Sequence, residues 1–287
     1  MSKRISGLSA IASDYRAILC DVWGVLHNGQ SVYRQAEDAL VRYRQGGGQV
    51  VLLTNSPRPN HGVASQLDDL QVDRQAFDAI VTSGDVTRTL ISQTKGDVFH
   101  LGPERDLPLF DGLDKKLVGP DDCQAVVCTG MFEDEIETPE DYRDQLTALA
   151  KRQIPFICAN PDLVVERGNR MIYCAGSLAK LYDESGGKTL VAGKPHSPIY
   201  NLAMQRLEEI NGAAMPQESV IAVGDGMPTD VAGALSNGFD LLYISAGIHS
   251  ASYGPADDPN EDELAAFLAD HKAEPTVWMP RLCWKVG

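Results

Sequence analysis

Two acidic segments far apart in the chain have the residue types and spacing of a metal-dependent catalytic site. The first is Asp21-Val22-Trp23 after the apolar run Ala17–Cys20, and the second is Asp225–Asp230 after the apolar run Val220–Val223. Carboxylates at the carboxyl ends of parallel strands lie in the crevice where open α/β sheets bind ligands. Oxygen ligands of this kind suit Mg²⁺, which binds one or two carboxylates together with water and substrate phosphate. Each acidic segment alone could equally begin a turn or cap a helix.

Two further segments offer groups that bind phosphate. The apolar run Gln49–Leu53 ends in Thr54-Asn55, which provides a hydroxyl and backbone N–H groups just before an expected helix. The run Thr189–Ala192 leads into Lys194, and Ser197-Pro198 then has the pattern of a helix start. A lysine at such a corner can place a point charge against phosphate oxygens, although a lone lysine there is more often a solvated surface charge.

In their order along the chain, these segments resemble the four motifs of the haloacid dehalogenase (HAD) superfamily. The resemblance makes Asp21 the nucleophile, Thr54 the phosphate-binding hydroxyl and Lys194 the lysine of the third motif. Asp225 and Asp230 then form the acidic metal motif. The chain is most similar to subclass IIA, the NagD-type nucleotide phosphatases and pyridoxal phosphate phosphatase, whose members carry a large α/β cap between the second and third motifs.

Two segments between these motifs also look like signatures of subclass IIA, namely Asn160-Pro161-Asp162 and Gly176-Ser177-Leu178. From the resemblance we place Asn160 and Asp162 near the substrate, and Asn55 with Thr54 and Lys194 at the phosphate. The alternative is that the first segment is only a tight turn and the second only a helix start.

The predicted fold is α/β, with a Rossmann-like, doubly wound parallel sheet as the core and an inserted α/β cap domain. Core strands with intervening helices are expected at Ala17–Cys20, Gln49–Leu53, Ala79–Thr82, Thr189–Ala192, Val220–Val223 and Leu241–Ile244. The core is predicted at residues 1–94 plus 189–287 and the cap at residues 95–188, which is long enough for a small core of its own. Within the cap, a helix is expected at Pro139–Lys151 and strands at Asp97–Leu101, Ala125–Cys128 and Phe156–Ala159.

The resemblance implies a mechanism in which Asp21 attacks phosphorus while Mg²⁺ is bound by Asp21, Asp225 and the backbone carbonyl of Trp23. Asp230 would orient the water shell of the metal or the side chain of Lys194. In phosphatases of the family, an aspartate at the position of Trp23 protonates the leaving group and activates water. An indole can do neither, and general acid–base help is typically worth about 10²–10⁴ in rate.

Three interpretations of Trp23 are open at this stage. The chain could be a phosphatase with a weakened acid–base step that favours aryl or acyl phosphates. It could be a HAD enzyme of other chemistry, such as cleavage of carbon–halogen or carbon–phosphorus bonds, or a phosphate-binding regulatory protein with impaired catalysis. The intact nucleophile, lysine and metal motif favour an enzyme that acts on a small phosphorylated metabolite. Trp23 could also simply fill space below the cap.

The composition excludes several other classes of protein. A chain of 287 residues with 43% hydrophobic content can bury a substantial core, and its net charge of -15 argues against nucleic acid or anionic membranes as partners. No apolar stretch approaches the ~20 residues of a membrane span, and no secretory signal begins the sequence, so a cytoplasmic protein is expected. The six cysteines lack CxxC spacing and are expected to be reduced core residues. The resemblance also makes a homodimer possible.

Overall fold

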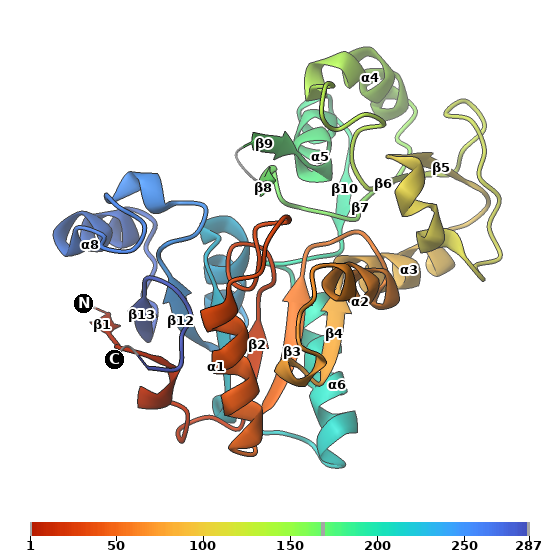
Figure 1. The fold of residues 1–287 in the computed structure, drawn as a ribbon. Helices are drawn as coiled ribbons and strands as arrows, with labels where there is room; N and C mark the ends of the chain where they lie inside the picture. The colour runs from red at the N-terminus through yellow and green to blue at the C-terminus, as the bar shows by residue number, and fades with distance from the viewer. Residues whose placement is uncertain (1, 168–169, 286–287) are drawn as a thin grey trace. The chain divides into compact units, whose positions relative to one another are not determined.

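The computed structural model describes residues 2–167 and 170–285, which form two compact units. The first unit comprises Met1–Thr54, Ser65–Val81 and Tyr200–Gly287, and the second comprises Asn55–Ala64 and Thr82–Ile199. Each unit has its own parallel sheet with helices packed on it (Figure 1).

A seven-stranded sheet in the order β1-β13-β12-β11-β2-β3-β4 forms the centre of the first unit. Its strands are β1 (Lys3–Arg4), β2 (Ala17–Cys20), β3 (Gln49–Thr54), β4 (Ala79–Thr82), β11 (Val220–Gly224), β12 (Asp240–Ile244) and β13 (Val277–Met279). From β2 the chain continues outward through β3 and β4, whereas from β11 it continues in the opposite direction through β12 and β13. The strand order therefore reverses between β2 and β11, and open α/β sheets bind ligands at such a switch point.

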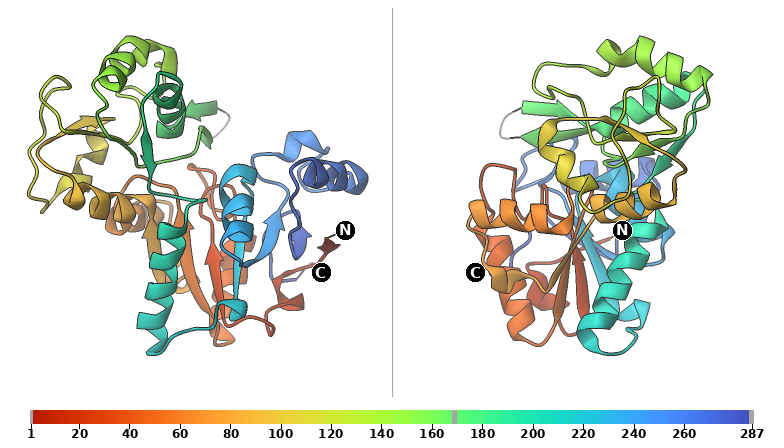
Figure 2. Two further views of the ribbon diagram at one scale, coloured as in Figure 1. Left: turned by 180° about the vertical axis from the view of Figure 1, so that it is seen from behind. Right: turned by 90° about the vertical axis from the view of Figure 1, so that its right-hand side faces the viewer.

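Helices cover both faces of this sheet. One face carries α1 (Arg34–Gln45), and the other carries most of α6 (Ser197–Asn211) and α7 (Ala232–Ser236), as Figure 2 shows. Strands β2 and β11 are buried along their whole length. Coverage of both faces explains why these strands have unbroken apolar sequences instead of alternating ones. Two further helices are α2 (Asn60–Asp69) and α8 (Glu261–Asp270).

A four-stranded parallel sheet in the order β10-β7-β6-β5 forms the centre of the second unit. Its strands are β5 (Val98–Leu101), β6 (Ala125–Cys128), β7 (Phe156–Cys158) and β10 (Thr189–Val191). An antiparallel hairpin is formed by β8 (Val164–Arg167) and β9 (Arg170–Tyr173). The helices of this unit are α3 (Ser83–Gln93), α4 (Arg143–Lys151) and α5 (Ala175–Glu184).

Alternating side chains of this sheet build two separate apolar clusters. Val126 and Cys128 of β6 belong to a cluster with residues of α4 and α5, whereas Ala125 and Val127 belong to a cluster with Ile91 of α3. This alternation follows from the two-residue period of a strand. Both faces of the small sheet are therefore packed, as an independent core requires.

Shorter turns complete the described chain. Turns of 3₁₀ helix occur at Leu8–Ala10, Arg74–Ala76, Glu104–Phe110, Pro139–Tyr142, Gln217–Ser219 and Ser250–Ser252, and a π-helical turn occurs at Met227–Val231. Within residues 2–167 and 170–285, no helix is both long and apolar enough to cross a membrane.

The predicted fold class is confirmed, but one predicted core strand is wrong. Residues 189–192 were expected in the core sheet, yet β10 pairs with β7 in the sheet of the second unit. Leu190 of β10 is exposed, because β10 is an edge strand. A short edge strand has too few buried residues to mark which sheet it joins. The domain limits 1–94 plus 189–287 and 95–188 stay a prediction.

Candidate active site

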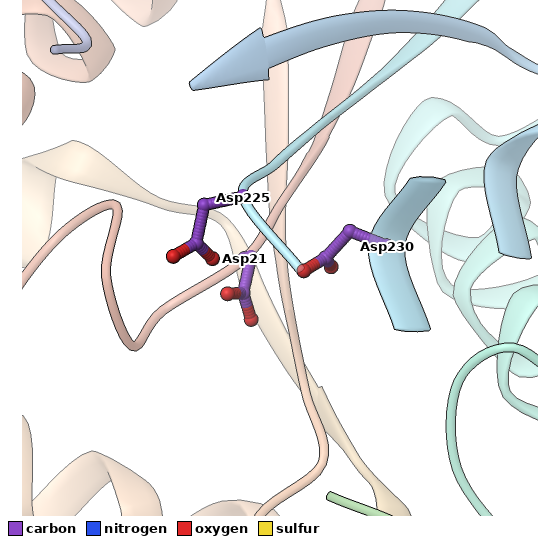
Figure 3. Close-up of side chains that lie close together, drawn as sticks. All are labelled: Asp21, Asp225 and Asp230. Carbon is purple, nitrogen blue, oxygen red and sulfur yellow. The ribbon is translucent and has the colours of Figure 1, made fainter. Parts of the chain in front are cut away.

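Three buried aspartates lie together where the strand order of the first unit reverses. Asp21 follows β2, Asp225 follows β11, and Asp230 lies in the π-helical turn after β11. One carboxylate oxygen of each lies within 4.8 Å of the others, and their exposed fractions are 7%, 4% and 6%. Figure 3 shows Asp21 on one segment and Asp225 and Asp230 on another, with the three carboxylates close to one another. The two acidic segments predicted from the sequence therefore meet.

Backbone donors orient two of these carboxylates. The N–H of Ile248 donates to Asp225 Oδ2 at 2.8 Å, and the N–H of Gly226 donates to Asp230 Oδ2 at 3.1 Å. Hydrogen bonds of this kind hold a ligand carboxylate in one orientation before a cation binds. The acidic loop is thus preorganised by its own main chain and by the loop after β12.

Two glycines allow the backbone to approach the Asp225 carboxylate closely. A Cβ atom at Gly24 would lie 2.4 Å from Asp225 Oδ2, and one at Gly247 would lie 1.9 Å from it. Gly24 also has a φ of +81°, a conformation that side chains rarely adopt. Any larger residue at either position would occupy the space of the carboxylate.

The donor set fits a small, hard divalent cation. Three buried carboxylates at this separation repel one another, and burial of like charge is costly unless a cation compensates it. All three donors are oxygens, which Mg²⁺ prefers, rather than the nitrogen and sulfur donors typical of zinc. In the described part of the chain, no other three His, Cys, Asp or Glu side chains have ligand atoms this close together.

Thr54 lies at the same edge of the sheet. It ends β3, is 2% exposed, and belongs to the strand next to β2. In the register of the sheet, Cys20 of β2 lies opposite both Leu52 of β3 and Val223 of β11. Asp21, Thr54 and Asp225 come shortly after these paired residues on the three strands, so they lie at the same end of the sheet. The hydroxyl predicted to bind phosphate is therefore on the strand adjacent to the predicted nucleophile.

The indole of Trp23 packs inside its own loop. A Cβ atom at Gly29 would lie 2.4 Å from the indole, and the rings of Trp23 and His27 meet edge-on with centroids 5.0 Å apart. The N–H of Gly29 donates to His27 Nδ1 at 2.9 Å, and burial lowers the pKa of His27 to about 4. His27 is therefore neutral near pH 7 and its Nδ1 is already occupied. Trp23 as a backbone metal ligand stays a prediction.

The remaining predicted residues lie in the second unit, where the structure joins them to one another. Asn55 Nδ2 donates to Asp162 Oδ1 at 2.9 Å and to the backbone oxygen of Lys194 at 3.3 Å. The N–H of Lys194 donates to Asn55 Oδ1 at 2.7 Å, and the N–H of Asp162 donates to Asn160 Oδ1 at 3.1 Å. The roles of these four residues at substrate stay predictions.

The loop after β12 was not anticipated from the sequence. Besides the Ile248 contact to Asp225, it contributes His249, whose Nε2 accepts a hydrogen bond from the N–H of Met227 at 3.1 Å. Burial lowers the pKa of His249, which favours the neutral acceptor form. A signal was present, because Gly247 comes shortly after a predicted core strand and strand ends share one edge of the sheet.

Comparisons with known proteins point to one superfamily over most of the chain. Residues 18–115 match the family model described as haloacid dehalogenase-like hydrolase, and residues 191–271 match the model described as HAD-hydrolase-like. A curated relative from Bos taurus, haloacid dehalogenase-like hydrolase domain-containing protein 2, is 26% identical over 243 residues. The match covers 83% of this chain and 86% of the relative.

Solved structures extend the match to nearly the full length. A hydrolase of the haloacid dehalogenase-like family from Brucella suis 1330 is 46% identical with a TM-score of 0.87, over 98% of this chain and 100% of that one. A possible sugar phosphatase of the HAD superfamily from Cytophaga hutchinsonii is 20% identical with a TM-score of 0.80, over 97% and 98% of the two chains. At that lower identity the match shows a shared fold.

Proposed function

This chain belongs to the haloacid dehalogenase-like hydrolase family, and from that premise we propose that it is a Mg²⁺-dependent phosphatase of a small phosphorylated metabolite. One observation carries the proposal, namely the three buried carboxylates that meet at the switch point of the sheet. Crowded like charges reduce the stability of a fold, so their presence is best explained by a function that needs them.

Asp21 is the nucleophile in this proposal. One of its carboxylate oxygens forms a bond to phosphorus while the bond from phosphorus to the ester oxygen breaks, and that oxygen leaves with the electron pair. Water then attacks the aspartyl phosphate, which releases inorganic phosphate and restores the Asp21 carboxylate.

The other predicted residues would bind and orient. Asp225 and the carbonyl of Trp23 would hold Mg²⁺ together with the nucleophile, and Asp230 would orient its water shell. When bound, Mg²⁺ neutralises charge on the phosphate oxygens. The Thr54 hydroxyl and the Lys194 ammonium would donate hydrogen bonds to the same oxygens.

Protonation of the leaving group is the step for which this chain is poorly equipped. Trp23 has no acidic proton to give, and the neighbouring His27 is neutral with its Nδ1 already bonded. Without a general acid, leaving groups that must be protonated lose about 10²–10⁴ in rate. Aryl and acyl phosphates release stable anions, so we place the substrate in that class.

Phosphate release from aryl phosphates of graded leaving-group acidity, and from alkyl phosphates, tests the proposal. We expect Mg²⁺-dependent release that falls steeply as the leaving group becomes more basic, with alkyl phosphates slower by about 10²–10⁴. Equal rates for aryl and alkyl esters would refute the missing-acid argument. Binding of inorganic phosphate without turnover of any ester would instead favour a phosphate-binding regulatory protein, and halide release without Mg²⁺ would favour dehalogenation.

Replacement of the indole gives a sharper test. Trp23→Asp should raise turnover of alkyl phosphates by about 10²–10⁴ and flatten the dependence on leaving-group acidity. Trp23→Phe is the matched control, because it keeps an aromatic ring against Gly29 and still offers no acid. If both variants behave alike in a folded protein, the acid is supplied from elsewhere and the proposed substrate class is wrong.

A further inference from the structure

Three segments that are far apart in the second unit's sequence meet at one side chain. The amide of Asn55 contacts the backbone of Lys194 and the carboxylate of Asp162. Asn55 follows the predicted phosphate-binding strand, Lys194 follows β10, and Asp162 follows β7. Each segment was singled out from the sequence separately, but their connection through a side-chain amide is a property of the structure.

The side-chain amide of Asn55 forms two hydrogen bonds with the backbone of Lys194, as the backbone of a neighbouring strand would. Asn55 Oδ1 accepts from the N–H of Lys194 at 2.7 Å, and Asn55 Nδ2 donates to the carbonyl of the same residue at 3.3 Å. Lys194 is 2% exposed, so water cannot readily replace either bond. Since buried backbone groups need partners, this two-point contact fixes the conformation of the residue that carries the ammonium group.

The contact leaves the Asn55 amide little capacity for substrate. Its second N–H donates to Asp162 Oδ1 at 2.9 Å, so both amide hydrogens are used. Asp162 is in turn oriented by its own N–H, which donates to Asn160 Oδ1 at 3.1 Å. A phosphate oxygen needs donors, and the donors of Asn55 already have acceptors within the protein.

Two glycines fit closely around this contact. A Cβ atom at Gly193 would lie 2.3 Å from Asn55 Oδ1, and one at Gly176 would lie 2.2 Å from the backbone oxygen of Pro161. There is therefore no room for a methyl group at Gly193, beside Lys194, or at Gly176, where the start of α5 packs against the Asn160–Asp162 turn. The contact is therefore buried and closely packed, unlike an incidental contact at the surface.

We propose that Asn55 is a positioning residue, and that Asn55 and Asp162 together form a clip that holds the backbone of Lys194. For its catalytic consequence the inference rests on the proposed phosphatase function, in which the Lys194 ammonium binds phosphate oxygens. The clip would then tie the correct placement of that ammonium to the turn at Asn160–Asp162. Asn55 and Asp162 act through Lys194 and not by touching substrate.

Hydrogen exchange at the Lys194 amide tests the clip without any assay of activity. In Asn55→Ala the exchange rate of this amide should rise by about tenfold or more, because its acceptor is removed. Asn211→Ala is the matched control, since it deletes a different side-chain amide, one that donates to the backbone oxygen of Ala213. Unchanged exchange at Lys194 in Asn55→Ala would overturn the clip.

Kinetics on the best aryl phosphate test the positioning role. Asn55→Ala should lower kcat by about 10²-fold, the loss typical of a misplaced catalytic group, with a much smaller change in KM. Asp162→Asn retains an oxygen that can accept from Asn55, so it should recover most of the kcat that Asp162→Ala loses. If Asp162→Asn is as impaired as Asp162→Ala while the Lys194 amide stays protected, the charge acts directly on substrate and the inference is wrong.

Gly193→Ala provides a second route to the same contact without deleting a polar atom. In the native background, the added methyl group should displace the Asn55 amide and reduce kcat. In the Asn55→Ala background the space is already free, so Gly193→Ala should reduce kcat by a smaller factor. Additive losses would count against the clip. If the native chain released no phosphate from any ester, the proposed function would fail, and the exchange measurement would still decide whether the clip exists. Faster exchange with an unchanged kcat would overturn the positioning role.

Discussion

The two units place very different groups at the carboxyl ends of their parallel strands. In the first unit, Asp21, Asp225 and Asp230 bring three like charges together in a buried space. In the second unit, His100 near the end of β5 and Thr129 directly after β6 are two neutral groups that hydrogen-bond each other at 2.9 Å. Strand ends of one kind of sheet can therefore either concentrate like charge or hold a hydrogen-bonded neutral pair, and of these two arrangements only the three carboxylates suit a cation.

This contrast separates the residues expected to perform chemistry from those expected to provide stability. Like charges held close together repel one another, so we expect the three carboxylates to contribute to metal binding more than to stability. The small sheet of the second unit instead has an apolar cluster on each face, with most of its large side chains fully buried. Substitutions in the two regions should consequently change different measured quantities.

The largest expected effect is loss of turnover in Asp21→Asn. Removal of the nucleophile should reduce kcat by about 10⁴-fold or more. Because the substitution also removes one of three crowded charges, the thermal unfolding midpoint without added metal should equal or exceed that of the native chain. Phosphate-release assays and calorimetry on the same samples measure both. A large fall in the midpoint would mean that the carboxylate is mainly structural.

The opposite pattern is expected for Leu146→Ala in the second unit. Leu146 is fully buried in the cluster of α4, α5 and the sheet, so truncation should lower the free energy of unfolding by about 2–5 kcal/mol. Leu163→Ala, at a residue that is 48% exposed, is the control and should stay within about 0.5 kcal/mol. Urea unfolding measures both. A loss of kcat per folded molecule comparable to that of Asp21→Asn would erase the contrast.

How far the sequence predicted this molecule depended on burial. Strands β2 and β11 are covered on both faces, so they appear as continuous apolar runs and the acidic residues after them are easy to locate. The half-exposed β10 was assigned to the wrong sheet, because its three residues are too short a pattern to identify a partner strand. The hairpin of β8 and β9 was not predicted, because its two strands are mostly exposed and have no sustained apolar pattern. Register and partner strand depend on contacts far apart in sequence.

The same limit applies to the candidate site. Motif spacing located Asp21 and Asp225, which the structure brings together. The resemblance to the family singled out Asn55 and Asp162, but their hydrogen bond to each other joins two separate loops and has no local signature. His249 was missed because a histidine that accepts a hydrogen bond from a distant backbone N–H leaves no periodicity in the chain.

A smaller effect should distinguish a carboxylate of the charged cluster from an equally buried one in the second unit. Asp230→Asn keeps an oxygen that can accept from the N–H of Gly226 but removes the charge, so Mg²⁺ activation should weaken by about 10–100-fold. Asp106→Asn is the matched control, because the Asp106 carboxylate is only 3% exposed and burial raises its pKa. Mg²⁺ titrations of activity compare the two. An equal shift in both variants would show that the charged cluster has no special part in metal binding.

The smallest expected effect concerns the neutral pair of His100 and Thr129 in the second unit. Burial lowers the pKa of His100 to about 4, whereas an unfolded chain has a histidine pKa of about 6.5. Between these values the unfolded chain binds a proton that the folded chain does not. The free energy of unfolding therefore falls as pH falls through this window, by about 1.4 kcal/mol per pH unit for this group, and the loss ends near pH 4.

His100→Gln should remove that pH dependence while keeping a polar atom that can bond Thr129. Urea unfolding of both proteins from pH 4 to 7.5 should give curves that meet near pH 7 and diverge on acidification, with the native chain the steeper of the two. Parallel curves would mean that the folded chain protonates His100 as readily as the unfolded chain does. The site of His100 and Thr129 would then also tolerate a charge, and its contrast with the carboxylate cluster would rest on the sign of the charge alone.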